Sequence, residues 1–166
     1  MAGQQQDYLL RQIEILGRLA ARLRKKVKPL DEQDRLELNE TLLLALHLQE
    51  RNFGMPAAEF LRLTADEQVA ALRKGESAAD GLERCLNYAA ILKATAELYA
   101  FRNNEDLALG ARQLALYFAL SVALEKPADA RAAETLIDEL RADLGEAGLH
   151  PPTRELLDRF EHPSSS

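Results

Sequence analysis

Residues 77–126 read SAADGLERCLNYAAILKATAELYAFRNNEDLALGARQLALYFALSVALEK, and they indicate the fold class more clearly than any other stretch. In the first half, apolar and small residues recur every three or four positions, the spacing of one helix face. These residues are Leu82, Cys85, Ala89, Leu92, Ala96 and Tyr99. Asn103-Asn104 follows, and both tolerate the left-handed backbone that interrupts a helix. Residues 105–125 carry two apolar faces, which predicts a second helix packed between neighbours.

The segments on either side of this hairpin have the same helical character. Leucine and alanine exceed a third of the chain, whereas Val, Ile and Thr supply only 12 of 166 residues, and this composition favours helix over strand. Periodicity and capping signals predict helices over 4–27, 31–52, 55–63, 65–74 and 127–144, and a last short helix after Pro152. We therefore predict an all-α protein of seven or eight helices in antiparallel hairpins, a short α-solenoid. It forms one domain over 1–161, with a disordered tail at 162–166.

Two expectations concern the first two helices. The first helix carries a single apolar seam made of Leu9, Ile13, Leu16, Ala20, Leu23 and Val27. Such a seam could pair with its symmetry mate, so a structural homodimer through this helix is one hypothesis for the function.

Between Leu42 and Leu48 the second helix is apolar nearly all round. We expect neighbours to bury that segment on more than one side.

The net charge of −6 is unevenly distributed along the chain. Residues 1–28 carry +5, mostly in the basic stretch from Arg18 to Lys28, and the remainder carries −11. An acidic body repels phosphates, which disfavours nucleic acid as a partner. The basic side chains form a solvated or internally paired face, a contact for a protein partner, or a contact for a membrane surface or nucleic acid. No apolar run is long enough to span a bilayer and no secretory signal opens the chain, so we expect a cytoplasmic protein without stable membrane insertion.

No pattern in the sequence indicates catalysis, a metal or a cofactor. His47 and Glu50 are three residues apart, but the Glu-x-x-His motifs of di-iron bundles are absent, so we expect His47 to be a partly buried histidine with a hydrogen-bonded neighbour. The single cysteine, Cys85, lies on an apolar seam, where a thiol is buried and inert. The glycines match no phosphate-binding loop. We predict a protein that is not an enzyme, with no catalytic residues, metal ligands or cofactors.

The hairpin resembles a tetratricopeptide (TPR) repeat. Ala96 and Ala100 flank Tyr99, an Asn-Asn-Glu-Asp turn follows, and Leu107-Ala108-Leu109 precedes Ala115-Leu116. In such repeats small residues let two helices approach and a tyrosine fills the gap. The chain departs from the consensus at Leu92, where tryptophan is usual, and at Arg112, where an aromatic residue is usual. The opening 6–14, QDYLLRQIE, is similar to the start of a bacterial helical family of unknown function.

The resemblance implies a site for a partner. The first helix of each TPR pair lines a concave groove, so Lys93, Glu97 and Phe101, spaced by four, would point into it. An aromatic residue beside charges is a usual anchor for a protein partner. Our first hypothesis is therefore a non-enzymatic cytoplasmic scaffold or adaptor that binds a protein or peptide. The alternatives are the structural homodimer and a small-ligand-binding helical protein, in which distant side chains converge on a pocket.

Overall fold

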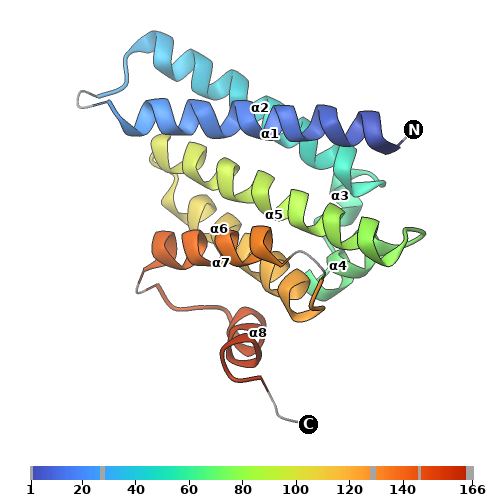
Figure 1. Ribbon diagram of the computed structural model, residues 1–166. Coiled ribbons are helices and arrows are strands. Elements are labelled where there is room, and N and C mark those ends of the chain that lie inside the picture. The colour runs from blue at the N-terminus through green and yellow to red at the C-terminus, as the bar shows by residue number, and fades with distance from the viewer. Residues whose placement is uncertain (1, 27–28, 128–129, 146, 164–166) are drawn as a thin grey trace.

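The computed structural model describes residues 2–26, 29–127, 130–145 and 147–163, and for 2–10 and Ala57 it describes the backbone alone. Eight helices and no strand lie within these ranges (Figure 1). They are α1 (Ala2–Arg24), α2 (Glu32–Phe53), α3 (Ala57–Phe60), α4 (Ala65–Arg73), α5 (Ala78–Phe101), α6 (Glu105–Leu124), α7 (Arg131–Leu144) and α8 (Pro151–Glu161). The predicted all-α fold class is confirmed. Residues 164–166 of the predicted tail lie outside the described residues.

Local capping chemistry begins or ends several helices where the sequence predicts it. The Glu67 amide donates to the Thr64 hydroxyl, and the Thr64 amide donates to the Glu67 carboxylate, so that α4 begins with the predicted capping box. Asp31 and Asp34 form the same reciprocal pair at the start of α2. Asn103 adopts a φ of 62° between α5 and α6, the left-handed conformation expected for this break.

The first helix ends earlier than predicted. α1 stops at Arg24, whereas the sequence favours helix up to Val27, which lies outside the described residues. The amides of Lys25 and Lys26 donate to carbonyls three residues back, a 3₁₀-type tightening common at helix ends. The Lys26 ammonium then donates to the Asp34 carboxylate at 2.7 Å, in the first turn of α2. This contact draws the chain out of α1 toward α2.

α5 is the central helix of the molecule. In Figure 1, α1, α5 and α7 run in the same direction, while α2 and α6 run the opposite way behind them. α5 packs against α1 and α2 on one side and against α4 and α6 on the other. The buried side chains form two clusters: one joins α1, α2 and α5 around Leu16, Leu48 and Leu98, and the other joins the end of α2 and the helices from α3 to α8 around Tyr88 and Phe118. α5 contributes one face to each cluster.

α6 is enclosed on several sides, as its two apolar faces predict. It contacts α4, α5, α7 and α8, and its residues from Ala115 to Leu120 are all buried. Among the described helices, α6 alone is long and apolar enough to cross a membrane, and half of its most apolar window is buried inside the molecule. Packing against four helices gives a sufficient reason for that apolarity, because a helix enclosed by neighbours is apolar all round.

The prediction for the second helix is wrong. Leu42, Ala45 and Leu48 are buried, but Leu43 is 68% and Leu46 is 43% exposed. α2 packs against α1, α3, α4 and α5, but its buried side chains share one face of the helix. The apolar run of the sequence therefore continues on to the molecular surface.

The apolar seam of the first helix is used inside the chain. Leu16, Ala20 and Leu23 are at most 2% exposed, and α1 packs against α2 and α5. This part of the seam is therefore used inside the chain, whereas the side chains of Leu9 and Val27 lie outside the described residues, and a homodimer through this helix stays a prediction.

Candidate functional site

Lys93 and Glu97 lie on the face of α5 that looks between α1 and α7. The Lys93 ammonium donates to the Glu97 carboxylate at 3.0 Å. Glu97 also accepts a hydrogen bond from Arg24 at the end of α1. On its other side Lys93 approaches the α7 carboxylates of Glu139, at 3.4 Å, and Asp143, at 3.9 Å. One ion-pair network therefore links three helices that run in the same direction.

Burial and pairing act against each other on the Glu97 carboxyl. Its side chain is only 11% exposed, and this desolvation alone would raise its pKa. The hydrogen bonds from Lys93 and Arg24 outweigh burial and hold the pKa of Glu97 below its usual range. Desolvation likewise acts to lower the pKa of Lys93, but the carboxylates around it, Glu97 first, raise that pKa above its ordinary value. Both groups are therefore charged in the folded protein at neutral pH.

We expect this pairing to make stability fall in acid. Because the pKa of Glu97 is lower in the folded than in the unfolded chain, its contribution is complete above the unfolded pKa of about 4.3 and is lost as the pH falls through the folded value. The urea midpoint of the wild type should therefore decrease between pH 5 and pH 3, and Glu97→Gln should decrease less steeply. Urea titrations at pH 3, 4, 5 and 7 measure this. Glu134→Gln, at an exposed carboxylate of α7, is the matched control and should keep the wild-type slope; an equal slope for Glu97→Gln contradicts the assignment.

The structure separates Phe101 from the other two predicted site residues. Phe101 packs against the cluster of α1, α2 and α5 and lines a cleft at the end of the molecule together with Leu23, Arg24 and Leu38. Lys93 and Glu97 do not line that cleft. The three residues predicted to share one groove thus lie in two places, because the last turn of α5 rotates Phe101 toward α2.

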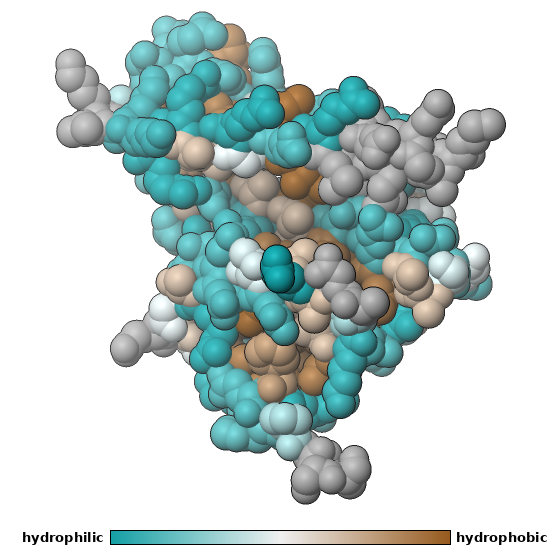
Figure 2. All heavy atoms as spheres, viewed as in Figure 1, coloured by the Kyte–Doolittle hydropathy of each residue, from teal (hydrophilic) through white to brown (hydrophobic). Residues whose placement is uncertain are grey.

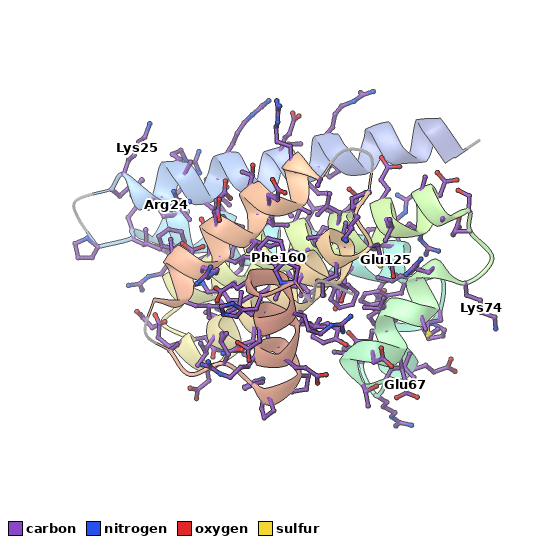
Figure 3. The ribbon with its side chains drawn as sticks, turned by 60° about the horizontal axis from the view of Figure 1, so that its bottom comes forward. Arg24, Lys25, Glu67, Lys74, Glu125 and Phe160 are labelled. Carbon is purple, nitrogen blue, oxygen red and sulfur yellow. The ribbon has the colours of Figure 1, made fainter. Side chains whose placement is uncertain are left out.

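The basic end of α1 is largely paired within the chain. Arg22 forms an ion pair with Glu37 of α2, Arg24 with Glu97, and Lys26 with Asp34. Figure 3 shows Arg24 directed toward the body of the molecule and Lys25 directed away from it. Internal pairing is one of the interpretations that the sequence allows, and the structure shows it for these three cations. Lys28 lies outside the described residues.

An apolar strip continues the face of α5 that carries Lys93 and Glu97. Leu82, Leu86 and Ala90 fall on this face by helical spacing and are half-buried. We call these three residues the α5 strip. Figure 2 shows apolar surface below α1 on this side of the molecule. The sequence does not single out this strip, because Leu82 reads as a core residue of the hairpin and the other two fall between its seams.

Neither of the remaining candidate residues forms a reactive centre. His47 is exposed on the outer face of α2, so the prediction that it is partly buried is wrong. Cys85 is fully buried, as predicted, and burial raises the pKa of its thiol to about 11, although Arg73 and Arg84 act in the opposite direction. Among the described residues, no group of three or more His, Cys, Asp or Glu side chains is placed to hold a metal ion.

The fold and the candidate site together define an all-helical protein with a central hairpin and an ion-pair network between parallel helices. Comparison with protein-family models gives no match for this chain, and comparison with curated proteins and with solved structures gives none either. The function is therefore argued from the geometry of this molecule.

Proposed function

We propose that this protein is a non-catalytic cytoplasmic scaffold or adaptor that binds a protein segment between α1 and α7, on the α5 strip. The observation that carries the proposal is the strip itself. Leu82, Leu86 and Ala90 are half-buried, and they lie on the face of α5 whose following turns, at Lys93 and Glu97, are joined by ion pairs to α7 and α1. A bound segment would cover this apolar surface and remove it from water.

The arrangement of the helices supports a TPR-like interpretation. In TPR repeats the first helices of successive pairs line the concave side, and here α1 and α5 each open a helical pair and run parallel to α7 (Figure 1). α5 packs against both helices of the preceding hairpin, and α7 packs against both α5 and α6. Lys93 and Glu97 then position the flanking helices, while the α5 strip contacts the partner.

Affinity capture from an extract of the native cell tests the proposal. We expect the wild-type chain to retain a protein that Leu86→Arg does not retain, because a guanidinium on the strip places a charge where the partner would be apolar. The control is Leu61→Arg, since Leu61 is an exposed leucine outside the strip. Helical circular dichroism establishes that all three chains are folded.

Two outcomes of that capture contradict the proposal. One is retention of the same proteins by Leu86→Arg and the wild type. The other is equal loss with Leu61→Arg, which would mean that any added surface charge abolishes capture.

A structural homodimer is the second candidate function, and the outer face of α2 favours it. Leu36, Leu43 and Leu46 are 52%, 68% and 43% exposed, and their spacing of seven and three is that of a coiled-coil seam. Unlike this face, most of the described seam of α1 is buried. Light scattering at tens of micromolar would then give a dimer for the wild type and a monomer for Leu43→Glu. A monomeric wild type at that concentration removes this candidate and leaves the first untouched.

A further inference from the structure

A cleft of about 640 Å³ lies where the end of α1, the start of α2 and the end of α5 meet. Its volume falls within the range typical of small-molecule sites. Its lining residues come from these three helices and the turns beside them: Leu23, Arg24, Lys26, Pro29, Leu30, Arg35, Leu38, Asn39, Phe101, Arg102 and Asn103. The cleft is separate from the α5 strip, because none of the three strip residues lines it.

The inner wall of the cleft is apolar. Leu23 and Leu38 are 2% and 1% exposed, and Leu30 and Phe101 pack against the same core cluster. These four side chains carry no polar group, so no hydrogen bond to them is lost when water leaves this wall. An apolar body of a ligand could therefore cover it with a gain in free energy.

Among the described residues that line the cleft, every charged side chain is a cation. Arg24 and Lys26 are paired with carboxylates outside the lining, those of Glu97 and Asp34. Arg35 and Arg102 differ, because neither side chain forms a hydrogen bond or ion pair with any residue that the structure describes. Guanidinium groups only donate hydrogen bonds, so a polar group bound here must accept them.

The charge of the cleft contrasts with that of the surrounding chain. Residues beyond 28 carry a net charge of −11, yet Arg35 and Arg102 from that acidic part lie together with the basic end of α1. A local cluster of cations in a partly enclosed site attracts anions and binds them more strongly than an open surface does. Carboxylate and phosphate are the anionic acceptors that a planar guanidinium recognises best.

We propose that this cleft binds a small molecule in which a carboxylate or phosphate group is attached to an apolar body. Arg35 and Arg102 hold the anionic group at the mouth of the cleft. The apolar body lies against Leu38 and Phe101. Lys26 and Arg24 add positive charge while remaining bonded to their own carboxylates, so binding does not require the α1–α2 or α1–α5 contacts to open.

Isothermal titration calorimetry of the full chain with four compounds tests this site. Decanoate and decyl phosphate carry the two anionic groups on one apolar chain, 1-decanol lacks the charge, and inorganic phosphate lacks the chain. We expect both amphiphilic anions to bind about tenfold to a hundredfold more tightly than 1-decanol, which is the effect of one charged hydrogen bond. The tighter of the two anions identifies the head group that the cleft prefers. Inorganic phosphate should bind weakly.

Substitutions of the lining residues test whether the compounds bind in the cleft. Arg35→Gln/Arg102→Gln should weaken the binding of decanoate at least tenfold without weakening that of 1-decanol, and Phe101→Ala should weaken both. Arg154→Gln is the control, because Arg154 is an exposed arginine of α8. Thermal unfolding shows that each variant is folded. The proposal is overturned if decanoate and 1-decanol bind equally, if the double variant binds decanoate like the wild type, or if inorganic phosphate binds as tightly as decyl phosphate. None of these variants alters the α5 strip, so failure here leaves the proposed protein-binding function standing.

Discussion

Tyr88→Ala should lower the free energy of unfolding by about 4 kcal/mol, the largest effect we expect from any single truncation. The Tyr88 ring is fully buried and lies edge-on to three others: Phe53 at 5.3 Å, Phe60 at 5.5 Å and Phe118 at 4.8 Å between ring centroids. Those rings come from α2, α3 and α6, so the truncation opens a cavity between three helices. For a chain of this size the loss corresponds to about 10 °C in Tm, which differential scanning calorimetry measures.

Tyr88→Phe is the matched comparison, because it keeps the ring and removes only the hydroxyl. That hydroxyl has no hydrogen-bond partner among the residues that the structure describes, and burial raises its pKa far above the ordinary value. A buried polar group without a partner costs about 1–3 kcal/mol. We therefore expect Tyr88→Phe to keep or raise the free energy of unfolding. A loss comparable with that of Tyr88→Ala would show that the hydroxyl, and not the ring packing, stabilises this cluster.

Arg84→Met should lower the free energy of unfolding by about 3 kcal/mol, the next largest effect. The Arg84 guanidinium donates to the carbonyl of Leu72 at 3.1 Å and to the carbonyl of Asn52. These carbonyls belong to the last turns of α4 and α2, where the helix itself supplies no donor. The Arg84 side chain thus satisfies the last turns of two other helices, and methionine keeps an unbranched apolar stem while removing both donors. Urea denaturation measures the effect.

Arg154→Met provides the control for that experiment. Arg154 is exposed on α8, and its side chain makes no hydrogen bond or ion pair with the described part of the chain. Its replacement should change the free energy of unfolding by less than about 0.5 kcal/mol. Equal effects of the two substitutions would contradict the assignment of Arg84 as the residue that joins the ends of α2 and α4.

Helix positions could be predicted from the sequence because the signals that set them are local. The Thr64–Glu67 box and the Asn103 break each act within a few residues, and the structure confirms both. Tyr99 illustrates where a local pattern is insufficient. From the TPR resemblance we expect Tyr99 to fill the gap between the two helices of the hairpin, but it packs against the cluster of α1, α2 and α5. Tyr88 contacts Phe118 of α6 instead, although the apolar seam described for residues 82–99 does not include it.

The site could be predicted only in part, since its geometry depends on distant segments. The spacing of Lys93 and Glu97 gives their shared face, but their partners Arg24 and Asp143 lie far away in the sequence and carry no local signal. The exposure of Leu43 could not be predicted either, because an apolar run is compatible with burial on one side or on several. Tertiary packing decides both features.

Site-specific photocrosslinking in the native cell tests whether a protein segment binds the α5 strip. A benzophenone amino acid replaces Leu86 on the strip, and the same residue replaces the exposed Leu61 as control. The account predicts a discrete crosslinked product from position 86 that position 61 does not give, identified by mass spectrometry as another protein. No product at position 86, or the same products at both positions, would contradict it.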